Sequence, residues 1–259
     1  MSRKTAIITG GSSGIGAASA LELAKAGCNI LVTYASNKKG GENIAEVCRT
    51  EGVEAIAVQA DVSSNDDCIT VNKAAVDKWG RVDILVNSAG MTRFLSSAAL
   101  SAIDADDFAR IYEVNVTGTF QMIRAVEEEI IKAKGSIVNI SSHAGKSGLG
   151  SSMVYASSKA ALNTLTLSLA RHFAPNVRVN AVCPGFVGTD WMAPRFEPEQ
   201  FEKFKETVAS LAPLKTLVLA EDVAEAVLWF ALGGTKITGQ QLTIDGGTHL
   251  TTATPVKND

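Results

Sequence analysis

The sequence predicts an α/β fold, in which a doubly wound parallel sheet of about seven strands carries helices on both faces. Short apolar, β-branched runs alternate with segments of helical character along the chain. The first run, Thr5–Thr9, carries no charge, as expected for a strand that is buried on both sides. No linker or internal repeat interrupts the alternation, and successive strand–helix–strand units build a single parallel sheet.

The elements follow in order from this alternation and from their boundary residues. Gly27 ends the first helix, and Ser64 or Asn65 caps the third. Strands are predicted at residues 5–9, 29–34, 54–62, 82–86, 135–140, 177–182 and 240–245. Helices are predicted at residues 17–26, 40–50, 65–79, 104–131, 153–173 and 221–232.

Residues 1–250 are therefore predicted to form one domain, followed by a disordered C-terminal tail at 251–259. Within the domain, residues 190–214 combine prolines with several aromatic side chains. We interpret this segment, called the flap below, as a short helical cover over a pocket. An ordinary packing helix and a subunit contact are the alternatives.

Composition excludes several classes of function. Of the 259 residues, 46% are hydrophobic and 20% are charged, and the net charge is −3, which is typical of a globular domain and not of a protein that binds nucleic acid or an anionic membrane. We find no signal peptide and no apolar run of transmembrane length. The scattered cysteines and three histidines predict no metal site, and reduced thiols favour a cytoplasmic location; the cysteines are Cys28, Cys48, Cys68 and Cys183.

A glycine-rich turn at residues 10–16 lies between the first predicted strand and the first helix. Glycines are needed where the backbone approaches a phosphate closely, and a helix N-terminus offers free N–H groups to that phosphate. This context indicates a Rossmann-type dinucleotide site, with a plain tight turn as the alternative.

The second strand ends at Tyr34, where a fold of this type that prefers NAD(H) would place an acidic residue. Ser36, Asn37, Lys38 and Lys39 follow instead. Hydroxyl, amide and ammonium groups favour the additional phosphate of NADP(H), with NAD(H) as the alternative cofactor. The two lysines could also be an ordinary solvated loop.

Candidate chemistry gathers between residues 141 and 159. Tyr155 and Lys159 are four residues apart, which places both side chains on one face of a helix. A neighbouring cation favours the phenolate, so we expect Lys159 to lower the pKa of Tyr155. Ser142 follows the preceding strand and could bind the same substrate oxygen. Asn115, inside the helical segment 104–131, is either a satisfied core amide, which the residues alone favour, or a functional kink.

The carboxyl ends of parallel strands share one edge of a sheet, where ligands bind. Gly10, Asp61, Asn87, Ser142 and Pro184 all fall at the carboxyl ends of predicted strands. These residues are therefore expected to converge on one site.

Taken together, these motifs resemble the classical short-chain dehydrogenase/reductase family over nearly the whole chain. The resemblance rests on the glycine turn, on Asp61–Val62, on residues 87–90 with Ser88 in place of an asparagine, and on residues 184–189 and 239–247. The cofactor contacts that it implies are Gly10, Ser12, Ser13, Gly14, Ile15, Gly16, Tyr34, Ser36, Asn37, Asp61, Val62, Asn87, Ala89, Gly90, Tyr155, Lys159, Pro184, Gly185, Val187 and Thr189. Within the family, the chain is most similar in its motifs to 3-oxoacyl-carrier-protein reductases and related ketoreductases.

The resemblance also implies a catalytic tetrad of Asn115, Ser142, Tyr155 and Lys159, in which Asn115 anchors a proton-relay water. Tyr155 would be the general acid and base in the interconversion of a carbonyl and a secondary alcohol. The implied substrate contacts are Ser142, Ala144, Leu149, Tyr155, Trp191 and Met192. Family members are often tetramers, so we expect a homotetramer or homodimer acting on a small-molecule carbonyl or alcohol.

Three alternatives stay open at this point. The chain could be an NAD(H)-dependent sugar, steroid or other alcohol dehydrogenase of the same family. A nucleotide-sensing regulator without catalytic activity could use the same fold. An epimerase or dehydratase of the extended type would need a larger substrate domain than the residues after Thr189 provide.

Overall fold

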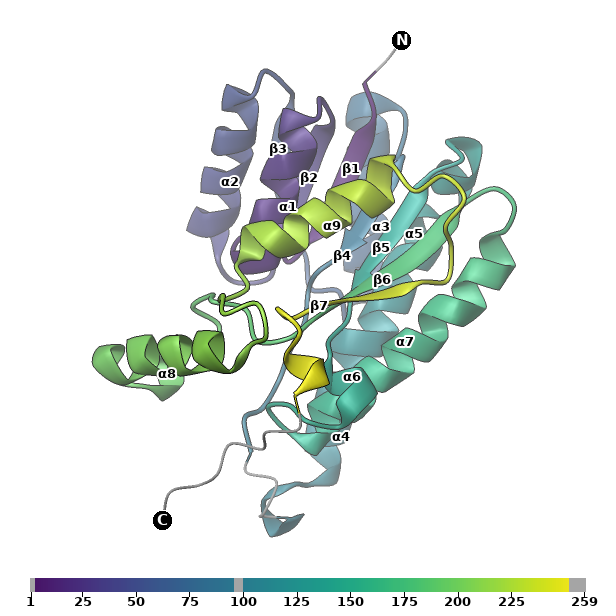
Figure 1. Cartoon of the computed structure of the whole chain (residues 1–259). Helices are drawn as coiled ribbons and strands as arrows, with labels where there is room; N and C mark the ends of the chain where they lie inside the picture. Colours follow the sequence, from purple (N-terminus) through teal and green to yellow (C-terminus); the bar gives the residue numbers. More distant parts are fainter. Residues whose placement is uncertain (1–2, 96–99, 252–259) are drawn as a thin grey trace, which may run out of the picture.

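The protein is built on one seven-stranded sheet with the strand order β3-β2-β1-β4-β5-β6-β7, and every neighbouring pair is parallel (Figure 1). The computed structural model describes residues 3–95 and 100–251. The order reverses between β1 and β4, so the two halves of the sheet grow in opposite directions from this point. The strands are β1 (Thr5–Thr9), β2 (Asn29–Tyr34), β3 (Ala55–Gln59), β4 (Ile84–Asn87), β5 (Ser136–Ile140), β6 (Arg178–Pro184) and β7 (Gln241–Ile244).

Helices cover both faces of the sheet, which confirms the doubly wound α/β class. Helices α1, α2 and α9 pack on one face, and α3, α5 and α7 pack on the other. The α-helices are α1 (Gly14–Lys25), α2 (Lys38–Thr50), α3 (Asn65–Trp79), α4 (Ala105–Tyr112), α5 (Thr119–Lys132), α6 (Ala144–Ser147), α7 (Met153–Phe173), α8 (Pro198–Leu211) and α9 (Ala220–Leu232). The remaining helical turns are η1 (Leu100–Ala102), η2 (Glu113–Gly118), η3 (Ala193–Arg195) and η4 (Thr248–Leu250).

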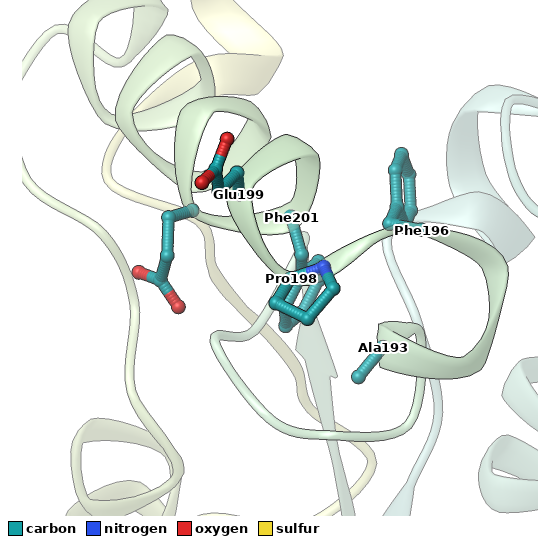
Figure 2. Close-up of a pocket in the computed structure, with 6 residues that line it drawn as sticks. Ala193, Phe196, Pro198, Glu199 and Phe201 are labelled. Carbon is teal, nitrogen blue, oxygen red and sulfur yellow. The ribbon is translucent and has the colours of Figure 1, made fainter.

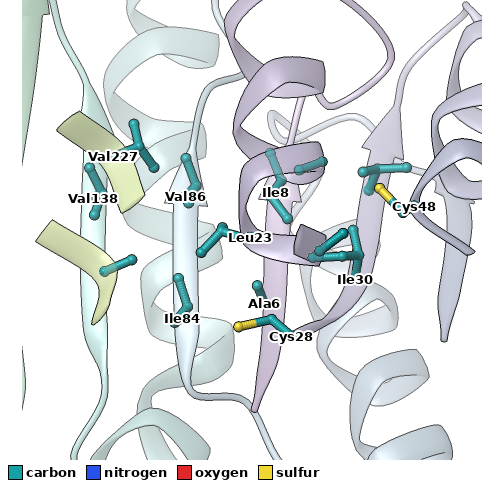
Figure 3. Packing of buried hydrophobic residues seen from close by; sticks show 14 of the residues in the cluster. Ala6, Ile8, Leu23, Cys28, Ile30, Cys48, Ile84, Val86, Val138 and Val227 are labelled. Carbon is teal, nitrogen blue, oxygen red and sulfur yellow. The ribbon is translucent and has the colours of Figure 1, made fainter. Parts of the chain in front are cut away.

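Two hydrophobic cores result, because successive side chains of a strand point to opposite faces. Ala6 and Ile8 of β1 enter the core beneath α1 and α9, whereas Ile7 enters the core beneath α3 and α5. Figure 3 shows the first core, with Leu23 of α1 lying among side chains of the central strands. Full burial of such a side chain contributes about 1.5–3 kcal/mol, so the two cores hold the sheet edge with its loops in place.

The long helical segment predicted at residues 104–131 is confirmed, because α4, the π-helical turn η2 and α5 follow one another without a gap from Ala105 to Lys132. The third strand is shorter than the predicted 54–62 and ends at Gln59. Conversely, α3 and α7 have the predicted bounds, and Ser64 caps α3 by accepting a hydrogen bond from the Asp67 N–H.

The flap departs from the body of the protein after β6. It contains η3 and then α8, which extends away from the sheet in Figure 1. Thr251 is exposed, and the rest of the predicted tail, residues 252–259, lies outside the described residues. Among the described residues, none of the helices combines the length and apolar character that a membrane span requires.

Candidate functional site

The glycine turn after β1 is closed by contacts that exclude side chains. Gly10 has a φ of +62°, and a Cβ atom on it would lie 2.8 Å from Ala89 Cα, in the loop after β4. A Cβ on Gly16 would clash with the Gly10 carbonyl oxygen. The Thr9 hydroxyl accepts hydrogen bonds from the N–H groups of Ser88 and Ala89, both at 3.0 Å. This threonine, which sequence reasoning missed, joins the loops after β1 and β4.

This turn fits the diphosphate of a dinucleotide. Ser13 is the N-cap of α1, but its side chain makes no capping hydrogen bond, and the first helical turn carries no acidic residue. The free N–H groups and the positive end of the helix dipole therefore remain available to an anion. Nearby, at the end of β4, the buried Asn87 Oδ1 has no hydrogen-bond partner among the described residues. The free N–H groups of the turn can donate to the diphosphate oxygens, and the unpaired Asn87 Oδ1 can accept from a donor of the cofactor.

The other predicted cofactor residues surround this turn. The Thr189 methyl group lies 3.6 Å from the position that a Cβ on Gly14 would take, so the start of the flap region reaches the turn. Pro184 ends β6 and Gly185 follows it, and Val187 forms an isolated bridge with Val218.

Beyond β3, the Asp61 carboxylate accepts hydrogen bonds from the N–H and hydroxyl of Ser63. The Val62 carbonyl accepts one from Gln121 Nε2 of α5, at 3.0 Å. Asp61 and Val62 therefore lie at the same edge of the sheet as the glycine turn, held to α5 through a backbone carbonyl.

At the end of β2, two predicted contacts differ from expectation. Tyr34 is only 7% exposed, and its ring lies so close to Gly41 that a Cβ there would be 2.5 Å from Tyr34 Cδ1. The Asn37 side chain caps α2 by accepting a hydrogen bond from the Gly40 N–H at 3.0 Å. Ser36 and Lys39 are exposed and leave this edge open to a phosphate.

Asn115 is fully buried in η2, and its side-chain amide is satisfied. Its Oδ1 accepts a hydrogen bond from the Met91 N–H at 2.7 Å. Its Nδ2 donates to the Met91 carbonyl at 2.9 Å and to the Ser158 hydroxyl at 3.0 Å. A π-turn widens the helix locally, which lets one amide reach the β4 loop and α7 at once. Asn115 is therefore a satisfied core amide that lies in a π-turn.

The structure brings Ser142, Tyr155 and Lys159 together beyond β5 (α6 and α7 lie side by side in Figure 1). Lys159 Nζ donates a hydrogen bond to the Ile140 carbonyl at 2.9 Å and lies 5.6 Å from the centroid of the Tyr155 ring. The Ser142 hydroxyl accepts a hydrogen bond from the Ala144 N–H at 3.1 Å.

Burial controls the ionisation of this pair. Burial raises the pKa of Tyr155 to about 12, although hydrogen bonding with Ser142 partly lowers it. Burial lowers the pKa of Lys159 to about 8. Burial is the largest influence on the Tyr155 pKa, and Lys159 is not among the groups that shift it, so the structure does not show the expected lowering of the Tyr155 pKa by Lys159.

The predicted substrate residues divide into two groups. Ala144 packs with Tyr155 in a small buried cluster, and the Trp191 ring meets the Tyr155 ring edge-on with centroids 5.8 Å apart. Met192 is half-buried, whereas Leu149 is 74% exposed on the surface. Sequence reasoning missed Phe94, whose ring lies 6.3 Å from that of Trp191. No sequence signal marks Phe94, because its loop reaches the site only in the folded chain.

Asp245, which lies in the motif at residues 239–247, supports the loop after β6. Asp245 accepts hydrogen bonds from the N–H groups of Gly247 at 2.9 Å and His249 at 2.8 Å, and its carboxylate lies 2.9 Å from His249 Nδ1. Burial by itself raises the pKa of Asp245, but the hydrogen bonds from His249 and its neighbours outweigh it and hold the pKa below its ordinary value. A Cβ on Gly185 would lie 2.7 Å from Asp245 Cβ, so this carboxylate backs the loop.

Two of the histidines, His143 and His249, thus come within 6.1 Å between ring centroids although they are distant in sequence. The described residues contain no group of three or more His, Cys, Asp or Glu side chains suited to hold a metal ion.

A surface pocket of about 350 Å³ lies within the flap and not at Tyr155 (Figure 2). Its apolar wall belongs to a cluster of phenylalanine rings in which Phe196 and Phe204 stack with centroids 5.1 Å apart. Its lining is Ala193, Phe196, Pro198, Glu199, Phe201 and Glu202.

Comparison with known proteins agrees with this geometry. Residues 10–249 match the family model described as enoyl-(acyl carrier protein) reductase. The chain is 39% identical over 246 residues to a Streptomyces violaceoruber protein named as a ketoacyl reductase of the granaticin polyketide synthase, covering 95% of this chain and 96% of that protein. It is 35% identical over 251 residues to the 3-oxoacyl-(acyl-carrier-protein) reductase of Synechocystis, covering 95% of this chain and 97% of that protein.

Solved structures show the same similarity. A crystal structure from Burkholderia xenovorans, described as a short-chain dehydrogenase/reductase, has a TM-score of 0.90 and 36% identity, covering 97% of this chain and all of that chain. Actinorhodin polyketide ketoreductase, solved with NADPH, has a TM-score of 0.86 and 29% identity, covering 96% of this chain and 99% of that chain. The chain belongs to the short-chain dehydrogenase/reductase family and is an oxidoreductase of its 3-oxoacyl-reductase-like ketoreductase type.

Proposed function

We propose that this protein uses NADP(H) to reduce the carbonyl of a 3-oxoacyl-like substrate to a secondary alcohol, with Tyr155 as the general acid. The observation that carries the proposal is a buried, protonated phenol beside Ser142 at the carboxyl edge of the sheet. Reduction of a ketone needs a proton donor at the oxygen, and a phenol with a pKa of about 12 holds its proton throughout the neutral range.

The cofactor would be held by groups already described. The turn at residues 10–16 and the N-terminus of α1 would bind the diphosphate, and the loop after β6 would contact the nicotinamide. When bound, the nicotinamide supplies the hydride or accepts it. The exposed Ser36, Lys38 and Lys39 support binding of an additional phosphate, because no acidic residue at the end of β2 opposes it.

Ser142 would orient and polarise the substrate oxygen. Its hydroxyl is fixed by the Ala144 N–H and lies at 3.5 Å from the Pro184 carbonyl, to which it donates. A hydroxyl held in place before the substrate arrives costs little reorganisation during the reaction. Tyr155 would then deliver its proton to the same oxygen.

Lys159 and Asn115 would support the phenol. The Lys159 ammonium stabilises the phenolate that forms after proton transfer, because opposite charges attract strongly in a buried site. Asn115 fixes the Met91 backbone and Ser158, which precedes Lys159 on α7, and so holds the site in register.

Association and location are also proposed. Leu167 on α7 and Leu242 on β7 are 41% and 38% exposed, which supports burial between copies in a homodimer or homotetramer. Four free, buried cysteines support a reducing, cytoplasmic location.

The test is NADPH oxidation by the purified protein with a panel of ketones that includes 3-oxoacyl thioesters, repeated with NADH. We expect turnover of 3-oxoacyl thioesters and a kcat/KM about 10–100-fold higher with NADPH than with NADH. Equal or NADH-favouring values would remove the cofactor assignment. Absence of turnover with every ketone would remove the reaction itself.

A further inference from the structure

Three aromatic rings lie in a row that begins at Tyr155, and we call this row, formed by Tyr155, Trp191 and Phe94, the aromatic mouth. Trp191 lies between the other two, with its ring centroid 5.8 Å from that of Tyr155 and 6.3 Å from that of Phe94. Trp191 is 50% exposed, so the row of rings leads from the buried phenol to the surface. An apolar or aromatic substrate body would be covered along this row.

At the outer end of the row, Arg195 lies over the face of Phe94. The guanidinium carbon is 4.7 Å from the ring centroid, and the side chain belongs to η3, one helical turn after Trp191. Stacking fixes the plane of the guanidinium while its N–H edges remain free to donate. Arg195 is exposed, and its guanidinium N–H groups can therefore donate to a ligand.

The charges around Arg195 support this view. In the part of the chain that the structure describes, the Arg195 guanidinium forms no ion pair or hydrogen bond, although Asp190 and Glu197 lie nearby in sequence. The contrast is Arg93, adjacent to Phe94, whose guanidinium forms a salt bridge with Asp107. Arg93 is therefore paired within the protein, whereas the Arg195 guanidinium can bind a ligand.

We infer that Arg195 binds an oxyanion, a carboxylate or a phosphate, at the far end of a carbonyl substrate whose apolar body lies along the aromatic mouth. The inference rests on the proposed function, since it assumes that the carbonyl of the same substrate reaches Tyr155. The flap pocket in Figure 2 does not bind the oxyanion, because Glu199 and Glu202 line this pocket and would repel an anion.

The experiment compares matched substrates that differ only in charge. One pair is an aryl ketone carboxylic acid and its primary amide, and a second pair is a 3-oxoacyl phosphopantetheine thioester and the same thioester of pantetheine, which lacks only the phosphate. The first pair reports carboxylate recognition and the second reports phosphate recognition. For each pair, the ratio of kcat/KM for the anionic over the neutral substrate is measured.

Arg195→Gln should lower this ratio about 10–100-fold for at least one pair, mainly through KM, since a charge-assisted hydrogen bond contributes about 1.5–3 kcal/mol. Arg195→Lys, which keeps the charge but not the fork, should restore part of the loss. Lys203→Gln removes the same charge from an exposed site on α8 and should leave the ratio unchanged. Unchanged ratios in Arg195→Gln for both pairs would overturn the inference.

Calorimetric binding of the same pairs to the protein with its cofactor separates the two proposals. If anionic ligands bind more tightly to the wild type than to Arg195→Gln but no ketone is reduced, the proposed reaction fails and the inference stands. If ketones are reduced and binding does not depend on Arg195, the inference about Arg195 fails and the proposed reaction stands.

Discussion

Lys159 Nζ lies 5.6 Å from the centroid of the Tyr155 ring and donates its hydrogen bond to the carbonyl oxygen of Ile140, at 2.9 Å. The ammonium is thus anchored on the strand end and not on the phenol. Lys159 is 4% exposed and Tyr155 is 7% exposed, and this burial disfavours the charged form of each side chain.

The first prediction concerns stability as a function of pH. The Lys159 pKa is about 8 in the folded protein, against 10.5 ordinarily, so between these values the unfolded chain holds a proton that the folded chain lacks. Stability from this group is therefore lost as pH falls through 8 and is fully present above 10.5. Lys159→Met should remove this dependence.

Chemical denaturation of both proteins from pH 7 to 10.5 measures the effect. The unfolding free energy of Lys159→Met relative to wild type should fall with rising pH, by up to about 3 kcal/mol. Lys146→Met, at an exposed lysine, serves as the control. A pH-independent difference would show that Lys159 is not perturbed by burial.

The second prediction concerns the direction of the reaction. Reduction needs the neutral phenol and oxidation needs the phenolate. Because burial raises the Tyr155 pKa to about 12, kcat/KM for ketone reduction should stay level from pH 6 to 7, below the Lys159 pKa of about 8, whereas alcohol oxidation should rise about tenfold per pH unit over this range. Initial rates in both directions across this range test the assignment, and an oxidation rate independent of pH would contradict it.

The third prediction concerns Trp191. Aromatic ring contacts contribute about 0.5–1.5 kcal/mol, so Trp191→Ala should raise KM for an aryl ketone about 3–10-fold while cofactor affinity changes little. Trp229→Ala, at a half-exposed indole on α9, is the matched control. Identical KM values for Trp191→Ala and wild type would mean that the flap does not contact substrate.

Sequence alone predicted the elements whose signals are local. The bounds of β1, β2, α3 and α7 followed from apolar runs, capping residues and period. The edge of the sheet where Gly10, Asn87 and Ser142 meet also followed, since parallel strands share their carboxyl end.

The features that sequence missed depend on distant partners. The amide of Asn115, in the π-turn, is satisfied by the Met91 backbone and Ser158, which lie 24 and 43 residues away. Tyr34 is covered because Gly41 lets α2 approach its ring. The Tyr155 pKa depends on burial, which no spacing of residues encodes. Tertiary contacts therefore set the ionisation and the entrance of the site, whereas the sequence pattern set its location.

The central claim, that Tyr155 donates the proton, is tested most directly by Tyr155→Phe. The variant keeps the ring beside Trp191 and removes only the hydroxyl, so the fold and NADPH binding should remain. Tyr112→Phe, at a ring stacked on Phe108 of α4, is the control and should retain full activity. We predict that kcat for ketone reduction falls about 10²–10⁴-fold in Tyr155→Phe with an unchanged Kd for NADPH. A near-native kcat in this variant would contradict the account.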